Sequence, residues 1–132
     1  MNHGAHGEIK DCETHIIDAV LSAATRVHQE LGPGLLESVY ELALTAELEE
    51  AGIDVSRQVT IPVAYRGDLG AGFRADIIVA NSLLLEIKAV DELKPVHLAQ
   101  TMTYLKLLKY KRGFLLNFNT TLMKHGIKRV SI

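Results

Sequence analysis

The sequence lacks the cysteine pairs, the long hydrophobic runs and the leader-like N-terminus that mark secreted and membrane proteins. Cys12 is the one thiol in the chain, so no internal disulfide can form, and no Cys and His spacing suggests a zinc site. No segment approaches the roughly 20 apolar residues of a membrane span. The first residues lack the basic and then apolar layout of a signal peptide. We therefore expect a cytoplasmic protein with no membrane partner.

The chain also lacks low-complexity tracts, internal repeats and a linker that would divide it. Its 132 residues, 48% of them hydrophobic, suffice for one compact domain with a buried core. We expect a tail over residues 1–13 and a single domain over residues 14–132.

Charge is distributed unevenly along the chain. Residues 1–85 hold 5 Lys or Arg against 13 Asp or Glu, whereas residues 86–132 hold 9 against 3. A basic half can attract the phosphates of nucleic acid. A solvated basic face is the more ordinary explanation of such a pattern, so charge alone leaves both interpretations open.

Hydrophobic spacing and turn residues predict the element order ααβββαββ. The expected helices are at about 14–31, 35–51 and 95–108, and the expected strands are at 55–65, 71–80, 83–90, 113–118 and 127–132. Gly-Pro-Gly at 32–34 separates the first two helices, and Pro62 indicates an edge or bulged strand. Strands that are apolar on both faces need helices on both faces. The sequence therefore predicts an α/β fold with a central mixed β-sheet flanked by α-helices.

Two charges lie inside the apolar run LLLEIKAV at residues 83–90. Alternation along a strand places Glu86 and Lys88 on the same face. The preceding strand carries Asp76, and a hairpin with the three-residue loop Ala80–Ser82 would pair Asp76 with Glu86. A two-residue turn would put Asp76 on the wrong face. We predict the three-residue loop, or a bulge with the same effect.

Two carboxylates directly across an antiparallel pair lie roughly 5 Å apart at Cβ, so they repel each other unless a cation lies between them. Asp76 and Glu86 offer the oxygen ligands that Mg²⁺ accepts, and a bound Mg²⁺ keeps waters, one of which can attack a phosphodiester. Lys88 can orient or deprotonate that water, or neutralise charge on the phosphorus. The simpler alternative is a surface salt bridge between Lys88 and either carboxylate.

Two helices contribute further polar pairs. Glu37 and Tyr40 lie three residues apart, and Glu37 lies at the edge of the buried stripe, where a carboxylate needs a partner. Gln100 and Tyr104 lie at positions i and i+4 of a later helix, beside His97. Each pair alone is a weak signal, because tyrosine at helical spacing is usually a core residue and glutamate in a first turn often only compensates the helix dipole.

Together these positions resemble a known enzyme superfamily. Asp76, nine intervening residues and then Glu86-Ile87-Lys88 before a helix resemble the core of the PD-(D/E)xK nuclease superfamily. Gln100 and Tyr104 resemble the helix of its exonuclease branch. The stretch GLLESVY at 34–40 is similar to the signature of the small GxxExxY proteins of this superfamily.

The resemblance implies a restriction-endonuclease-like core and a nuclease that uses Mg²⁺ or Mn²⁺. It does not imply the substrate, and DNA is our own expectation for the nucleic acid. The implied catalytic residues are Asp76, Glu86, Lys88, Glu37, Gln100 and Tyr104. The implied metal ligands are Glu37, Asp76, Glu86 and the main-chain carbonyl of Ile87. Ala75 departs from the pattern, because the superfamily's name has proline there.

The expected nucleic-acid contacts include a basic stretch, KLLKYKR. The full set is Tyr40, Arg74, Gln100, Tyr104, Lys106, Lys109, Lys111 and Arg112. Lysines at a helix C-terminus are also favoured by the helix dipole, so the stretch is as well explained without a ligand. The alternative function is a catalytically silent nucleic-acid- or protein-binding module with the same fold, and apolar helix faces allow a homodimer.

Overall fold

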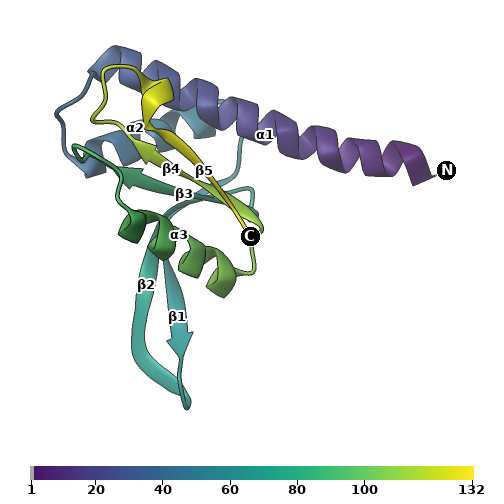
Figure 1. Cartoon of the computed structure of the whole chain (residues 1–132). Helices are drawn as coiled ribbons and strands as arrows, with labels where there is room; N and C mark the ends of the chain where they lie inside the picture. Colours follow the sequence, from purple (N-terminus) through teal and green to yellow (C-terminus); the bar gives the residue numbers. More distant parts are fainter. Residues whose placement is uncertain (1) are drawn as a thin grey trace.

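A five-stranded mixed β-sheet forms the centre of the molecule, with helices on both of its faces (Figure 1). The computed structural model describes residues 2–132, with side chains described for 12–69 and 72–132. The elements are α1 (Asn2–Leu31), α2 (Glu37–Glu50), β1 (Val55–Ala64), β2 (Asp68–Val79), β3 (Leu83–Lys88), α3 (Pro95–Leu108), β4 (Arg112–Asn117), the 3₁₀ helix η1 (Met123–Gly126) and β5 (Ile127–Ser131). The predicted order and the α/β fold class are confirmed.

The strands lie side by side in the order of the sequence. β1 pairs with β2, β2 with β3 and β4 with β5 in antiparallel fashion, whereas β3 and β4 are parallel. The parallel pair is joined through α3, because parallel neighbours need a long crossover. β1 is an edge strand and its register shifts between Pro62 and Ala64, which confirms the prediction made from Pro62.

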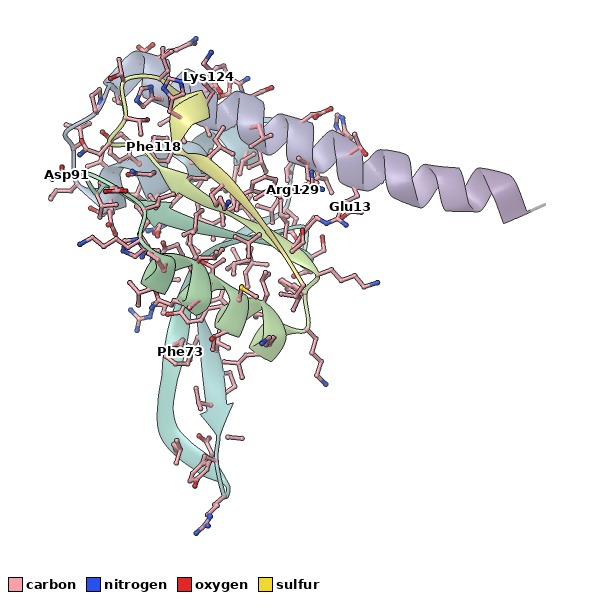
Figure 2. All side chains as sticks on the ribbon, in the orientation of Figure 1. Glu13, Phe73, Asp91, Phe118, Lys124 and Arg129 are labelled. Atoms are coloured by element: carbon pink, nitrogen blue, oxygen red, sulfur yellow. The ribbon has the colours of Figure 1, made fainter. Side chains whose placement is uncertain are left out.

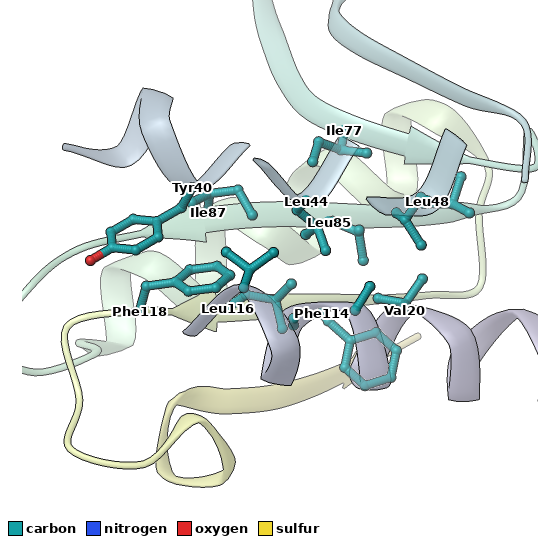
Figure 3. Close-up of a cluster of buried hydrophobic side chains, with 14 of the residues drawn as sticks. Val20, Tyr40, Leu44, Leu48, Ile77, Leu85, Ile87, Phe114, Leu116 and Phe118 are labelled. Carbon is teal, nitrogen blue, oxygen red and sulfur yellow. The ribbon is translucent and has the colours of Figure 1, made fainter. Parts of the chain in front are cut away.

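The two faces of the sheet bury separate apolar clusters. Leu83, Leu85 and Ile87 of β3 pack with α1 and α2 (Figure 3). Leu84 packs on the opposite face with Leu105 of α3. Complete burial of each such side chain contributes about 1.5–3 kcal/mol. Because side chains alternate along β3, this one strand packs against α1 and α2 on one face and against α3 on the other.

The first helix is longer than expected. α1 begins at Asn2, whereas hydrophobic spacing predicted a start near Thr14. A helix that has already nucleated elongates at little cost, and residues 2–13 contain no proline to stop it. Met1 lies outside the described residues, and the boundary between tail and domain at residue 13 stays a prediction. No helix in the described part of the chain is both long and apolar enough to cross a bilayer.

Tyr40 closes the break between α1 and α2. Gly32 and Gly34 take positive φ values of 69° and 95°, which glycine adopts without strain. The Tyr40 hydroxyl donates to the carbonyl of Gly32 at 2.5 Å and accepts from the amide of Leu35 at 3.1 Å. The tyrosine therefore satisfies two backbone groups of the loop.

The β1–β2 hairpin extends beyond the rest of the sheet. β2 pairs with β3 only over Ile77–Val79, whereas its pairing with β1 continues to Asp68. Residues 59–75, here called the arm, project past α3 (Figure 1). Tyr65 near the tip is 64% exposed. Figure 2 shows Phe73 on the part of the arm nearest α3.

Candidate active site

The hairpin between β2 and β3 has the predicted register. Val79 pairs with Leu83 and Ile77 with Leu85, so the loop is Ala80–Ser82. Ala80 and Asn81 have φ values of 52° and 53°, the left-handed geometry that closes such a loop. Continuing the register by one step places Asp76 level with Glu86.

Asp76 lies where β2 separates from β3. Its Oδ2 accepts a hydrogen bond from the Ile87 amide at 2.8 Å. Ala75 and Ile78 both pack toward α3, so the alternation of β2 is interrupted beside Asp76. The backbone of β2 is therefore irregular at this point, and Asp76 does not follow the regular alternation of a strand.

Glu86 is buried beside Asp76. Its side chain is 5% exposed, and its Oε1 has no hydrogen-bond partner among the described residues. Burial, followed by the charge of Asp76 and a side-chain hydrogen bond with it, raises the pKa of Glu86 to about 9, and Lys88 only partly opposes this rise. Without a cation, Glu86 therefore holds a proton at neutral pH.

The helix α3 brings Gln100 and Tyr104 to the same place. The Gln100 amide donates to the Tyr104 hydroxyl at 3.0 Å. Burial raises the pKa of Tyr104, and the charges of Glu86 and Asp76 raise it further, which places the phenol beside both carboxyls. Tyr104 is 6% exposed, so it can brace the site but is poorly placed to contact nucleic acid.

Glu37 reaches the site from α2 across a cavity. The cavity, here called the acidic cavity, has a volume of about 710 Å³ and is lined by Leu35, Leu36, Glu37, Ser38, Glu41, Arg57, Gln58, Asp76 and Ala89. The Glu37 carboxylate accepts from the Ala89 amide at 3.3 Å. Glu37 is the first residue of α2 and is exposed, although it lies on the same helix face as the buried Tyr40 and Glu41.

A hydrogen-bonded group on the wall of the acidic cavity, Glu41 with Arg57 and Gln58, was not predicted from the sequence. Glu41 is 4% exposed, and its carboxylate accepts from Arg57 Nη2 at 2.5 Å and from Gln58 Nε2 at 2.7 Å. Glu41 follows Glu37 by four residues, and that spacing, which places both on one helix face, could have revealed it. No signal in the sequence marks Arg57 and Gln58.

Tyr40 is not accessible to nucleic acid. Its side chain is fully buried, its ring stacks on Phe118 at 4.5 Å, and its hydroxyl is bonded to the loop before α2. The prediction of Tyr40 as a nucleic-acid contact is therefore wrong. The tyrosine of the GLLESVY stretch stabilises the fold, whereas the glutamate faces the cavity.

The basic stretch after α3 lies away from the carboxyl groups. Lys109, Lys111 and Arg112 line a different cavity together with Ser82, which precedes β3. Arg112 also forms an ion pair with Glu13 of α1 at 2.8 Å. The register of β3 with β4 places Arg112 level with the start of β3, five positions before Lys88. Lys109, Lys111 and Arg112 therefore line a different cavity from the one that Glu37 and Asp76 line.

The remaining predicted contacts are accessible. Lys106 in the last turn of α3, Gln100 earlier in that helix and Arg74 on the arm are all exposed. Lys88 is partly buried near Glu86. Of the predicted residues, Asp76, Glu86, Lys88, Gln100 and Tyr104 come together, with Glu37 on the cavity wall.

The donor atoms suit a hard divalent cation. Within the described residues, no group of three or more His, Cys, Asp or Glu has the arrangement of a complete metal site. Two carboxyls nevertheless lie together, and Oε1 of Glu86 is buried without a partner. Crowded carboxylate oxygens with an unsatisfied acceptor fit Mg²⁺ or Mn²⁺, which bind one or two protein carboxylates and retain water.

A family model described as the PD-(D/E)XK nuclease superfamily matches residues 14–130. No curated protein and no solved structure matches the chain. The matched range includes every residue of the site described above, and the closer likeness to the GxxExxY proteins stays a prediction. The placement of Asp76 on β2 and of Glu86 and Lys88 on β3 agrees with this match. The chain belongs to the PD-(D/E)XK nuclease superfamily.

Proposed function

We propose that the protein is a nuclease that hydrolyses phosphodiester bonds with a divalent metal, with DNA as the expected substrate. The observation that carries the proposal is Glu86, a buried carboxyl placed against Asp76 with one oxygen unsatisfied. Such an arrangement costs folding free energy unless a cation is its partner. A purely structural role gives no reason to keep it.

The residues have distinct roles in the proposed reaction. Asp76, Glu86 and Glu37, with the carbonyl of Ile87, would hold Mg²⁺ or Mn²⁺. When bound, the metal supplies a nucleophilic water at neutral pH and polarises the phosphate. Lys88 orients the attacking water or stabilises the negative charge that develops on the phosphate. Gln100 holds the Tyr104 hydroxyl beside the two carboxyls and fixes that wall of the site.

The proposal predicts that cleavage depends on Asp76 and Lys88. Wild type is incubated with single-stranded DNA, duplex DNA and RNA in Mg²⁺ or Mn²⁺, and cleavage is followed on gels. We expect Asp76→Asn and Lys88→Ala to lower the rate about 100-fold or more, because each removes a charge that acts on the transition state. Asp18→Asn, an exposed change on α1, serves as the control. Variants at Asp76 and Lys88 that cut as well as wild type would refute the assignment.

The second candidate is a binding module in which the same carboxyls are silent. The observation that favours it is the lack of a three-ligand acidic group among the described residues. Isothermal titration calorimetry separates the two functions. A wild-type protein that binds nucleic acid but takes up neither Mg²⁺ nor Mn²⁺ at millimolar concentration would be the module.

A further inference from the structure

We propose that Arg57, held by the buried carboxylate of Glu41, forms a phosphate-binding subsite on the wall of the acidic cavity. This subsite would take a backbone phosphate of the nucleic acid. The inference deepens the proposed function and rests on it for the identity of the ligand.

The geometry of the pair directs the guanidinium toward the cavity. The Glu41 side chain is 5% exposed, whereas that of Arg57 is 34% exposed, and both line the acidic cavity. Arg57 uses Nη2 to bind Glu41, and its other N–H groups have no partner among the described residues. A guanidinium carries five donors in a planar fork that matches the oxygens of a phosphate. Glu41 therefore fixes Nη2 of the Arg57 guanidinium, and the remaining N–H groups of the guanidinium are available to an anion.

The charge balance of the cavity favours a cationic group on its wall. Glu37, Glu41 and Asp76 line the cavity, and Arg57 is the one cationic side chain among its described lining residues. A polyanion that enters a cavity lined by carboxylates is repelled unless a fixed positive charge meets its phosphates. The basic residues after α3 lie elsewhere and cannot supply that charge.

The backbone of β1 is bent to make the arrangement. Neighbouring residues of a strand normally point to opposite faces, yet Arg57 and Gln58 both reach Glu41. They do so because Gln58 has a φ of 52°, and the β1–β2 pairing omits the position where Gln58 lies opposite Asp76. A non-glycine residue in this region costs about 1–3 kcal/mol, and such strain is concentrated at functional sites.

The structural alternative is that Arg57 only neutralises Glu41. Buried ion pairs often add little stability compared with apolar side chains of similar size. An apolar pair would also not need the unfavourable φ of Gln58. The Arg57–Glu41 pair is accompanied by an unfavourable backbone conformation at Gln58, and its guanidinium lines the cavity. A ligand of Arg57 explains this arrangement better than neutralisation of Glu41 does.

The test uses a double variant that leaves no unpaired buried charge. Glu41→Gln with Arg57→Gln removes both charges and keeps two polar side chains of similar shape. The matched control is Arg26→Gln with Glu47→Gln, a second Arg–Glu pair at 3.2 Å that lines a different cavity. Folding of each variant is checked by circular dichroism. Binding of a fluorescein-labelled single-stranded DNA oligonucleotide is measured by anisotropy in EDTA over a series of NaCl concentrations.

We expect the double variant at Glu41 and Arg57 to bind about 10-fold more weakly, the effect of losing one charge-assisted contact. The slope of log K against log [NaCl] should become shallower by about 0.7, the value for one phosphate contact to a single strand. The control pair should stay within about 2-fold of wild type. Equal affinity and equal slope in the double variant would overturn the subsite, as would a wild type that does not bind the oligonucleotide.

The outcomes separate this inference from the proposed function. A wild type that cleaves DNA in Mn²⁺ while the double variant keeps full affinity leaves the nuclease assignment intact and removes the subsite. A wild type that binds DNA through Arg57 but never cleaves it keeps the subsite and supports the binding module.

Discussion

At the scale of single residues, Glu86 has an unusual protonation state. An exposed glutamate has a pKa near 4.5, whereas burial beside Asp76 raises the pKa of Glu86 to about 9. Between these values the folded protein binds a proton that the unfolded chain has released. The free energy of unfolding therefore decreases as pH rises through this window when no cation is present.

Replacing Glu86 with glutamine should remove that loss. In EDTA we expect Glu86→Gln to be more stable than wild type at pH 8.5, and the difference to shrink toward pH 5.5, by up to about 1.4 kcal/mol per pH unit. Urea unfolding at pH 5.5 and pH 8.5 measures the free energy of unfolding of both proteins. Glu50→Gln, an exposed change, is the control and should follow wild type. Parallel pH profiles for wild type and Glu86→Gln would show that the carboxyl is ionised in the fold.

At the scale of elements, the β2–β3 hairpin and α3 could be predicted from the sequence. The register followed from one requirement, that Asp76 and Glu86 lie level, which a three-residue loop or an equivalent bulge satisfies, and the structure has the three-residue loop. The bounds of α3, Pro95–Leu108, follow from a proline at its first turn and an apolar face. Both features depend on local chemistry, which a single sequence records.

Other parts of the site depend on tertiary contacts and could not be predicted. The positive φ of Gln58 accompanies a hydrogen bond from its side-chain amide to Glu41 of α2, a residue of another element. The buried position of Tyr40 depends on Phe118, which is distant in sequence. The placement of the basic stretch depends on the parallel register of β3 with β4. Pairings between distant segments, not propensities, decided each case.

The loop between α1 and α2 offers a test at this scale. Tyr40→Phe keeps the ring stacked on Phe118 but removes the hydroxyl that serves Gly32 and Leu35. We expect a loss of about 1–3 kcal/mol in the free energy of unfolding, because two backbone groups lose their partner. Urea denaturation measures the change. Tyr65→Phe on the arm is the matched control, since that ring is 64% exposed. Equal losses in both variants would show that the hydroxyl of Tyr40 does not hold the loop.

At the scale of the whole molecule, the body and the arm make unequal contributions to stability. The described residues in 63–69 are all at least partly exposed, whereas Ile61 at the base of the arm is 1% exposed. The apolar cluster on the α3 face includes Ile61 but none of residues 63–69. The arm beyond Pro62 is therefore outside the core.

Shortening the arm should leave the rest of the protein folded. Deletion of residues 63–71, with Pro62 joined to Gly72 through Asn-Gly, should change the free energy of unfolding by no more than about 1 kcal/mol, because it removes little buried surface. In contrast, Ile61→Ala should cost about 2–5 kcal/mol, because it opens a cavity in the α3-side cluster. Chemical denaturation compares the two. A shortened protein as unstable as Ile61→Ala would place the arm within the core.

The separation of β2 from β3 has a mechanical consequence. At its C-terminal end, β2 pairs with β3 over Ile77–Val79. The rest of β2 pairs with β1 alone. Asp76 lies directly beside Ile77, the first residue of β2 that pairs with β3. A movement of the arm relative to β3 would therefore act first at Asp76, a carboxyl of the proposed active site. A force applied at Tyr65 would reach the Asp76 carboxyl along β2 through Ala75, which belongs to the apolar cluster on the α3 face.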